Sequence, residues 1–230
     1  MKKVVLFTTC ICAWAQSGWN RPQIGQMLDG QGSVRTVYGI ASSVSLGDAE
    51  MGGVLSYGCS KTLCLWKTAT SVVSPAGTAD APEGPAMFAF DGAGAFVWFP
   101  PSRRLARWEN DSLTYIDINI EGEVLSIGVK SGAVFFAVRR RGAVWIVNQD
   151  GSVAGALGRG TGAVMLVPGG VVYVERGEAV VGNARFPLEG VSAFFQMSDD
   201  YLQVRARGVD YALRITLGRE ALFQLPGVSQ

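Results

Sequence analysis

Histidine is absent from the 230 residues of this chain. Because histidine is the commonest general base and a frequent metal ligand, its absence excludes a Ser-His-Asp triad, a Cys-His pair and any imidazole metal site. The chain also has no phosphate-binding loop, activated nucleophile or zinc motif. The sequence therefore predicts no catalytic, cofactor-binding or metal-binding residue, and it excludes most hydrolase mechanisms.

Charge and long hydrophobic runs are also scarce. Charged residues make up 17% of the chain, and its formal net charge is only +1. A nucleic-acid-binding protein would need a clustered basic excess, so we expect no nucleic-acid partner. No apolar run is long enough to form a membrane helix, so we expect no membrane span.

Glycine is abundant instead, with 30 residues, and hydrophobic residues make up 48% of the chain. Short apolar runs alternate with Gly- or Asp-containing turns, and this order returns along the chain. The clearest unit has four runs separated by turns that each end in glycine, which accepts a positive φ at no steric cost. Its runs lie at 124–129, 133–139, 143–148 and 152–157. Such self-similar units are typical of a solenoid or a propeller.

We expect five such units, each of four short strands, without sustained helical periodicity. The units lie at 42–74, 86–118, 124–157, 163–188 and 191–225. The sequence therefore predicts an all-β fold, a β-propeller of about five four-stranded blades over residues 42–226, with a β-sandwich as the alternative. The propeller is favoured because a sandwich needs no similarity between units, and because runs such as 134–138 are apolar throughout. We expect Phe135, Val172 and Phe194 to be buried.

Tryptophans also recur. Trp66, Trp108 and Trp145 stand at matching points in the third runs of three successive units, which favours packing between blades. Several motifs resemble the degenerate repeats of bacterial secreted propellers, a group loosely similar to the WD40 and YVTN repeat proteins. These motifs are Phe90-Asp91-Gly92, Leu65-Trp66-Lys67 and Arg107-Trp108-Glu109. The Gly-His pair and the terminal Trp-Asp of WD40 repeats are missing. The resemblance implies a propeller fold with a scaffold role and marks no residue as functional.

The N-terminus has the three parts of a secretory signal peptide. Lys2 and Lys3 form a short basic region, and residues 4–13 are apolar but too few to span a bilayer. Ala13-Trp14-Ala15 fits the small-x-small rule for cleavage. We therefore expect residues 1–15 to be a signal peptide and the mature protein to be exported to the periplasm or the extracellular space. The alternative is a buried first strand.

Residues 16–41 separate this segment from the first unit. Residues 16–32 are rich in Gly, Gln and Asn, and we expect them to form a flexible leader. Residues 33–38 alternate polar and apolar side chains. We expect them to form an N-terminal strand that covers an outer edge or closes the ring.

Two cysteines, Cys59 and Cys64, remain after cleavage and fall in one predicted hairpin. An exported protein meets oxidising conditions, so the two can form a cross-strand disulfide if their Cα atoms lie within about 7 Å. The alternative is two small buried residues on one sheet. Neither arrangement gives a zinc site, because two thiols without histidine fall short of four ligands.

Two classes of function remain. One is a carbohydrate-active hydrolase or lyase, which needs two carboxylates within about 5 to 10 Å in a cleft. Its candidates are Asp91, Asp150, Asp199 and Asp200. All four fall in predicted hairpin turns, where aspartate is favoured because it hydrogen-bonds the local backbone. A structural role in turns is therefore the favoured interpretation of these residues.

The other class, which we favour, is an exported non-catalytic scaffold that binds a protein or glycan through loops on one face of the ring. Basic residues in turns form the candidate binding surface, and solvated loops are the alternative interpretation. These residues are Arg103, Arg104, Arg140 and Arg141.

Overall fold

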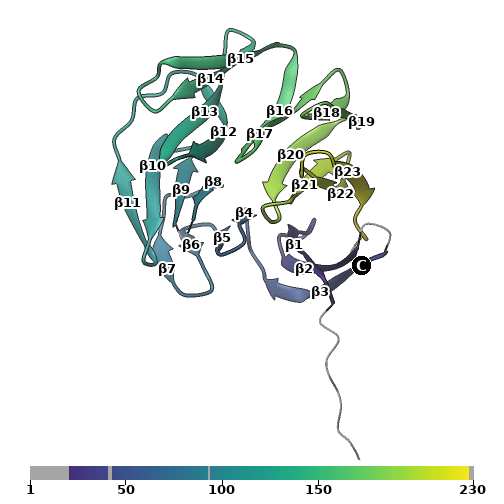
Figure 1. Ribbon diagram of the computed structural model, residues 1–230. Helices are drawn as coiled ribbons and strands as arrows, with labels where there is room; N and C mark the ends of the chain where they lie inside the picture. Colours follow the sequence, from purple (N-terminus) through teal and green to yellow (C-terminus); the bar gives the residue numbers. More distant parts are fainter. Residues whose placement is uncertain (1–20, 41–42, 93, 228–230) are drawn as a thin grey trace, which may run out of the picture.

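The computed structural model describes residues 21–40, 43–92 and 94–227, so the predicted signal peptide lies outside the described residues. Within these ranges the chain forms 23 β-strands and no helix. The strands make six antiparallel sheets, which lie around a ring (Figure 1). The all-β propeller fold is thus confirmed, and the alternative β-sandwich is not favoured.

Each sheet is one blade, built from consecutive strands. Blade 1 has three strands and the other five blades have four. Blade 1 is β1 (Gln23–Leu28), β2 (Val34–Ile40) and β3 (Ser43–Met51); blade 2 is β4 (Ser56–Cys59), β5 (Cys64–Lys67), β6 (Ser71–Val73) and β7 (Thr78–Asp80); blade 3 is β8 (Met87–Asp91), β9 (Gly94–Phe99), β10 (Arg104–Glu109) and β11 (Ser112–Ile116). Blade 4 is β12 (Glu123–Lys130), β13 (Ala133–Arg140), β14 (Ala143–Asn148) and β15 (Val153–Arg159); blade 5 is β16 (Thr161–Val167), β17 (Gly170–Glu175), β18 (Glu178–Val181) and β19 (Ala184–Pro187); blade 6 is β20 (Val191–Gln196), β21 (Tyr201–Ala206), β22 (Val209–Arg214) and β23 (Ala221–Gln224).

The predicted number of about five blades is wrong, because the first predicted unit mixes two sheets. Residues 43–46 of its first run belong to β3 of blade 1, and the true fourth strand of blade 2 is the short, polar β7. The expected flexible leader at 16–32 includes β1, which is a mostly buried strand. The remaining four predicted units correspond to blades 3 to 6.

Turn chemistry sets the register of the blades. In blade 4, Lys130 pairs with Ala133 across a two-residue turn of Ser131 and Gly132, whose φ values are +52° and +76°. Positive φ at both positions is the type I′ geometry, whose twist matches that of two antiparallel strands. Glycine takes the second position because a Cβ is disfavoured there.

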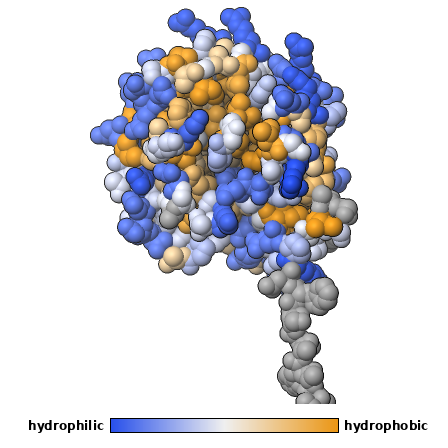
Figure 2. Space-filling model, in the orientation of Figure 1, coloured by the Kyte–Doolittle hydropathy of each residue, from blue (hydrophilic) through white to orange (hydrophobic). Residues whose placement is uncertain are grey.

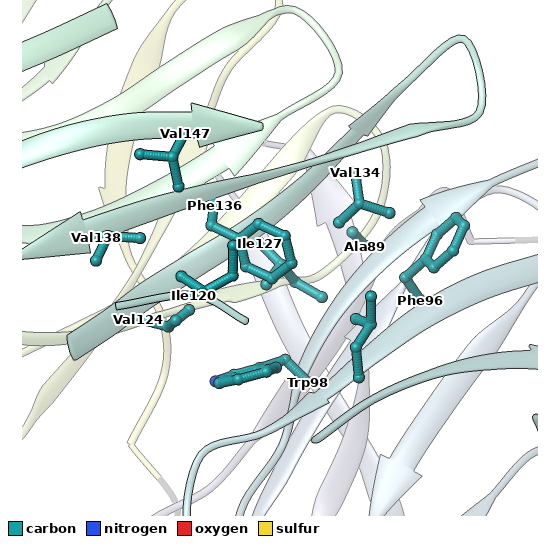
Figure 3. Packing of buried hydrophobic residues seen from close by; sticks show 11 residues of the cluster. Ala89, Phe96, Trp98, Ile120, Val124, Ile127, Val134, Phe136, Val138 and Val147 are labelled. Carbon is teal, nitrogen blue, oxygen red and sulfur yellow. The ribbon is translucent and has the colours of Figure 1, made fainter. Parts of the chain in front are cut away.

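The core lies between adjacent blades. Phe96 and Trp98 of blade 3 pack with Ile127, Val134 and Phe136 of blade 4 in one buried cluster (Figure 3). The rings of Trp98 and Phe136 meet edge to face with centroids 5.9 Å apart, an arrangement that aromatic quadrupoles favour. Burial of such large side chains is the main source of stability in this fold.

Burial follows the alternation of side chains along each strand. Val172 is buried as expected, but Phe135 and Phe194 are only half-buried. Successive side chains of β13 point to opposite faces, and Phe136 takes the core face. The strand neighbours of Phe135 are Gly128 and Asn148, which cover it poorly.

The tryptophan pattern needs a similar correction. Trp108 on β10 and Trp145 on β14 occupy third strands of their blades, as predicted. Trp66 lies on β5, which is a second strand, so it is not equivalent to the other two. Trp66 instead donates a hydrogen bond from Nε1 to Oε1 of Gln26 in blade 1, at 2.9 Å. It therefore helps to attach the three-stranded blade.

Over residues 21–40, 43–92 and 94–227, blade 1 has no innermost strand. The inner strands β4, β8, β12, β16 and β20 surround the axis, and β20 contacts β4 directly. The start of β1 lies beside the β20–β21 turn, where Ser198 Oγ donates to the carbonyl of Ile24 at 2.9 Å. The residues after β1 lie beside the start of β4, where the amide of Val54 donates to Gly32 O at 2.9 Å. β1 thus runs opposite to the inner strands and takes the place of a second strand.

Side chains from blades 2 and 6 satisfy the inward edge of β1. Gln203 of β21 accepts a hydrogen bond from the amide of Leu28 (2.9 Å) and donates one to its carbonyl (2.7 Å), as a neighbouring strand would. The buried Tyr57 hydroxyl donates to Gln26 O at 2.7 Å. At Gly25 an added Cβ would lie 2.3 Å from Met197 O, so only glycine permits this approach. The ring is closed by these contacts rather than by a shared sheet.

Candidate functional site

The ring has two distinct faces. All five inner strands begin at one end, which we call the start face, and end at the other, which we call the end face. Because the sheets are antiparallel meanders, the turns between second and third strands and the connections between blades lie on the start face. The turns after the inner strands and after the third strands lie on the end face.

The start face has a central funnel of about 630 Å³. The first residues of all five inner strands line it, and most are apolar, including Leu125, Met165 and Phe194. Leu55 at its mouth is 45% exposed. Arg139 and Glu123 form an ion pair of 3.0 Å in the same lining. The funnel is therefore a hydrophobic hollow with charged groups at its margin.

The end face has a larger hollow of about 910 Å³. Its walls combine hydrophobic residues such as Tyr173 and Ile215 with the carboxylates of Asp91, Asp199 and Glu220. Figure 2, in the orientation of Figure 1, shows one face of the ring with hydrophobic residues gathered near its middle and hydrophilic residues around them.

The four candidate aspartates fall into two pairs, one that lines the end-face hollow and one whose side chains accept hydrogen bonds. Asp91 and Asp199 line the end-face hollow from the β8–β9 and β20–β21 turns. Asp150 accepts hydrogen bonds from the amide and hydroxyl of Ser152, which hold the pKa of Asp150 below its ordinary value. Asp200 accepts one from Thr216 Oγ1 at 2.7 Å. Asp150 thus has the predicted hydrogen bond to the local backbone, whereas the side chain of Asp200 bonds to a threonine side chain 16 residues further along the chain. Among the described residues no group of three or more Cys, Asp or Glu could hold a metal ion.

All four candidate arginines lie on the start face, in two adjacent blades. Arg103 donates to the carbonyl of Gly122 at 3.1 Å and also to that of Ile120, and Arg140 donates to Glu121 O at 2.9 Å. Both side chains therefore hold the connection between blades 3 and 4. Arg104 lies over the ring of Tyr115, with its guanidinium carbon 3.6 Å from the ring centroid.

Arg141 differs from the other three. It is exposed at the tip of the β13–β14 turn, and within the part of the chain that the structure describes it makes no hydrogen bond or ion pair. Sequence reasoning missed its equivalents, Arg176 and Arg207, which occupy the same turn in blades 5 and 6. The signal that marks them is an Arg-Gly pair between the second and third strands of a blade.

The two cysteines are directly opposite in the register of β4 and β5, with Cα atoms 4.1 Å apart, and they form a disulfide. The bond closes the turn at Ser60, Lys61 and Thr62, which lines the end-face hollow. It fixes a part of this wall that is otherwise an exposed loop. No helix in the described ranges is long and apolar enough to cross a membrane.

Solved structures share the fold. One chain from the crystal structure of a nidogen/laminin complex superimposes with a TM-score of 0.52 at 13% identity, covering 88% of this chain and 92% of that chain. A protein of unknown function from Bacteroides caccae gives 0.52 at 12% identity, covering 80% and 82%. A β-propeller domain from Myceliophteria thermophila gives 0.48 at 10% identity, covering 91% of each chain. No protein-family model matches the chain, and no curated protein matches it. At these identities the comparisons show a fold and not a function.

Proposed function

We propose that this chain is an exported, non-catalytic β-propeller that binds a protein or a glycan across its start face. The observation that carries the proposal is the meeting of an apolar funnel and basic turn residues from adjacent blades on that one face. Loops on a rigid scaffold are the usual place for binding residues.

The anchoring of the connections supports the proposal. Arg103 and Arg140 fix the segment between blades 3 and 4 through its carbonyl groups. A surface held in this way loses little conformational entropy on binding, which favours affinity. The nidogen/laminin crystal structure is a complex of proteins, so a chain of this fold takes part in an assembly there.

Export rests on two features. The basic and apolar N-terminal residues have the pattern of a signal peptide, and disulfides such as Cys59–Cys64 persist in oxidising compartments. N-terminal sequencing of protein recovered outside the cytoplasm is expected to begin at Gln16. Soluble cytoplasmic protein that retains Met1 would contradict export.

Co-purification from the periplasm or the culture medium tests the binding role. We expect a tagged chain to retain a partner, and Leu55→Glu to lose it because a charge then enters the funnel mouth. Leu217→Glu is the matched control, since Leu217 is 82% exposed on the end face. Loss of the partner in the control alone, or in neither variant, would contradict binding across the start face.

A carbohydrate-active enzyme is the second candidate, because Asp91 and Asp199 line one hollow of about 910 Å³. A panel of glycosides and esters separates the two functions. We expect no turnover. Turnover that is abolished by Asp91→Asn or Asp199→Asn, kept by Asp150→Asn and accompanied by unchanged circular dichroism would reverse this ranking.

A further inference from the structure

One residue type recurs at one position in four successive blades. Arg103, Arg141, Arg176 and Arg207 each occupy the turn between the second and third strands of blades 3, 4, 5 and 6. Their φ values are 51°, 52°, 52° and 49°. The same left-handed backbone thus presents an arginine on the start face once per blade.

Arginine is an unusual choice for this backbone. Left-handed residues other than glycine are mostly asparagine or aspartate, whose short side chains bond to the local backbone. The other non-glycine residues with positive φ in the described ranges follow that preference for short polar side chains: Asn110, Asp111 and Ser131, all in end-face turns. Backbone strain of this kind persists where function requires it.

Two of these four arginines, and a further arginine at the end of β15, have no partner among the described residues. Arg141, Arg159 and Arg176 are exposed and, over the described part of the chain, make no hydrogen bond or ion pair. They lie in blades 4 and 5, where Arg159 ends the fourth strand at the start face. Arg207 pairs with Glu189, so blade 6 is partly neutralised. The unpaired arginines therefore lie on the start face of blades 4 and 5, where Glu123 is paired with Arg139 and where Glu175 and Glu178 are paired with Arg185.

The end-face turns carry an acidic excess, with Asp91, Glu109, Asp111, Asp150, Asp199, Asp200 and Glu220 against Lys61, Lys130, Arg214 and Arg219. The start face is mixed. Its acidic residues include Glu121, Glu123, Glu175, Glu178 and Glu189, and all of these except Glu121 take part in ion pairs. Unpaired arginines on such a face steer and orient an incoming acidic partner.

We propose that the start face binds an acidic protein surface, whose carboxylates contact Arg141 and Arg176 around an apolar contact at the funnel. This assignment rests on the proposed function. The planar guanidinium group matches a carboxylate through two parallel hydrogen bonds. A hydrophobic centre around Leu55 within a charged margin is the composition of a protein interface, and it favours a protein over an acidic glycan.

Binding of labelled poly-L-glutamate, followed by fluorescence anisotropy, tests the assignment. The variant Arg141→Gly/Arg176→Gly removes two charges while glycine keeps the turn geometry, so its melting temperature should not fall. We expect its affinity to fall by roughly tenfold or more, with the remaining binding lost at about 0.15 M salt. The control Lys130→Gln/Arg219→Gln removes two charges from the end face and should stay within about twofold of the unmodified protein.

Polygalacturonate provides the glycan arm, and we expect it to bind at least about tenfold more weakly than polyglutamate. Equal or tighter binding of polygalacturonate through the same arginines would overturn the assignment to a protein, as would an equal loss of polyglutamate binding in the control. Neither result would touch the proposed function, because that fails only if the co-purified partner is indifferent to Leu55→Glu.

Discussion

At the scale of single residues, polar side chains make the hydrogen bonds to β1 that the backbone of a neighbouring strand would otherwise make. Gln203 is buried and hydrogen-bonds the amide and carbonyl of Leu28, the Tyr57 hydroxyl and Asp210. The side-chain amide of Gln203 thus hydrogen-bonds the edge of β1 in the way that the backbone of an adjacent strand would. No periodicity in the sequence marks this glutamine, because its role depends on β1 lying opposite it from the other end of the chain.

Replacement of Gln203 tests this role. Gln203→Leu leaves the amide of Leu28 buried without a partner, while Arg205 still donates to its carbonyl at 2.6 Å. We therefore expect the free energy of unfolding to fall by about 2 kcal/mol. Chemical denaturation measures the change. Gln224→Leu, at an exposed position on β23, is the control and should change stability by less than about 0.5 kcal/mol. Similar losses in both variants would show that Gln203 does not close the ring.

A second residue-scale prediction concerns the left-handed arginines. Arg141→Gly removes the strain of a positive φ, and we expect it to stabilise the fold by about 1 kcal/mol. Arg107→Gly, inside the regular strand β10, should instead destabilise it because glycine weakens a strand interior. Thermal melts of the two variants show whether each substitution raises or lowers the stability of the fold. A lower melting temperature for Arg141→Gly would mean that this arginine stabilises the turn.

Asp29 gives the expected acid dependence. Burial alone would raise its pKa, but hydrogen bonds from Arg35 and from the amides of Ser33 and Gln31 hold the pKa below its ordinary value. A carboxylate of this kind stabilises the fold above its unfolded pKa of about 3.9, and this contribution is lost as the pH falls through the lower folded pKa. In unfolding measurements at decreasing pH, Asp29→Asn should show a shallower acid loss than Asp117→Asn, an exposed control. An equal loss of stability with falling pH in the two variants would exclude a stabilising role for the Asp29 carboxylate.

At the scale of strands and blades, regular units were predictable and irregular ones were not. Blades 3 to 6 repeat apolar runs and glycine turns, so the sequence pattern predicts their strands. The three-residue β7 is too short for its alternation to be detected, and blade 1 has no inner strand among the described residues to begin the pattern. The first predicted unit therefore began one strand too early. For the same reason Trp66 was assigned to a third strand instead of a second. Of the candidate arginines, Arg103 and Arg141 lie in turns as predicted, whereas Arg104 begins β10 and Arg140 ends β13. Their meeting on one face depends on the ring and could not be predicted.

The disulfide belongs to this scale because it joins β4 to β5. Cys59 and Cys64 are five residues apart, and closure of so short a loop contributes about 2 kcal/mol in the chain-entropy description. We expect a reducing agent to lower the melting temperature of the unmodified protein. The double variant Cys59→Ala/Cys64→Ala should melt lower than the oxidised unmodified protein and show no response to the reductant. An unmodified protein that ignores the reductant would count against a structural bond.

At the scale of the whole molecule, the six blades form a ring with two different faces. The start face combines an apolar funnel with unpaired arginines, while the end face combines a larger hollow with carboxylates. This difference between the faces predicts that one partner binds in one orientation. Binding in a single orientation would distinguish a propeller that recognises a specific partner from one that binds no partner.

Site-specific photo-crosslinking tests the use of the start face most directly. A photoreactive amino acid is placed at Leu55, on the start face, or at Leu217, on the end face, in the cells that make the protein. The account predicts a discrete covalent adduct from position 55, which disappears in Arg141→Gly/Arg176→Gly, and none from position 217. Adducts from position 217 alone, or from neither position, would contradict it.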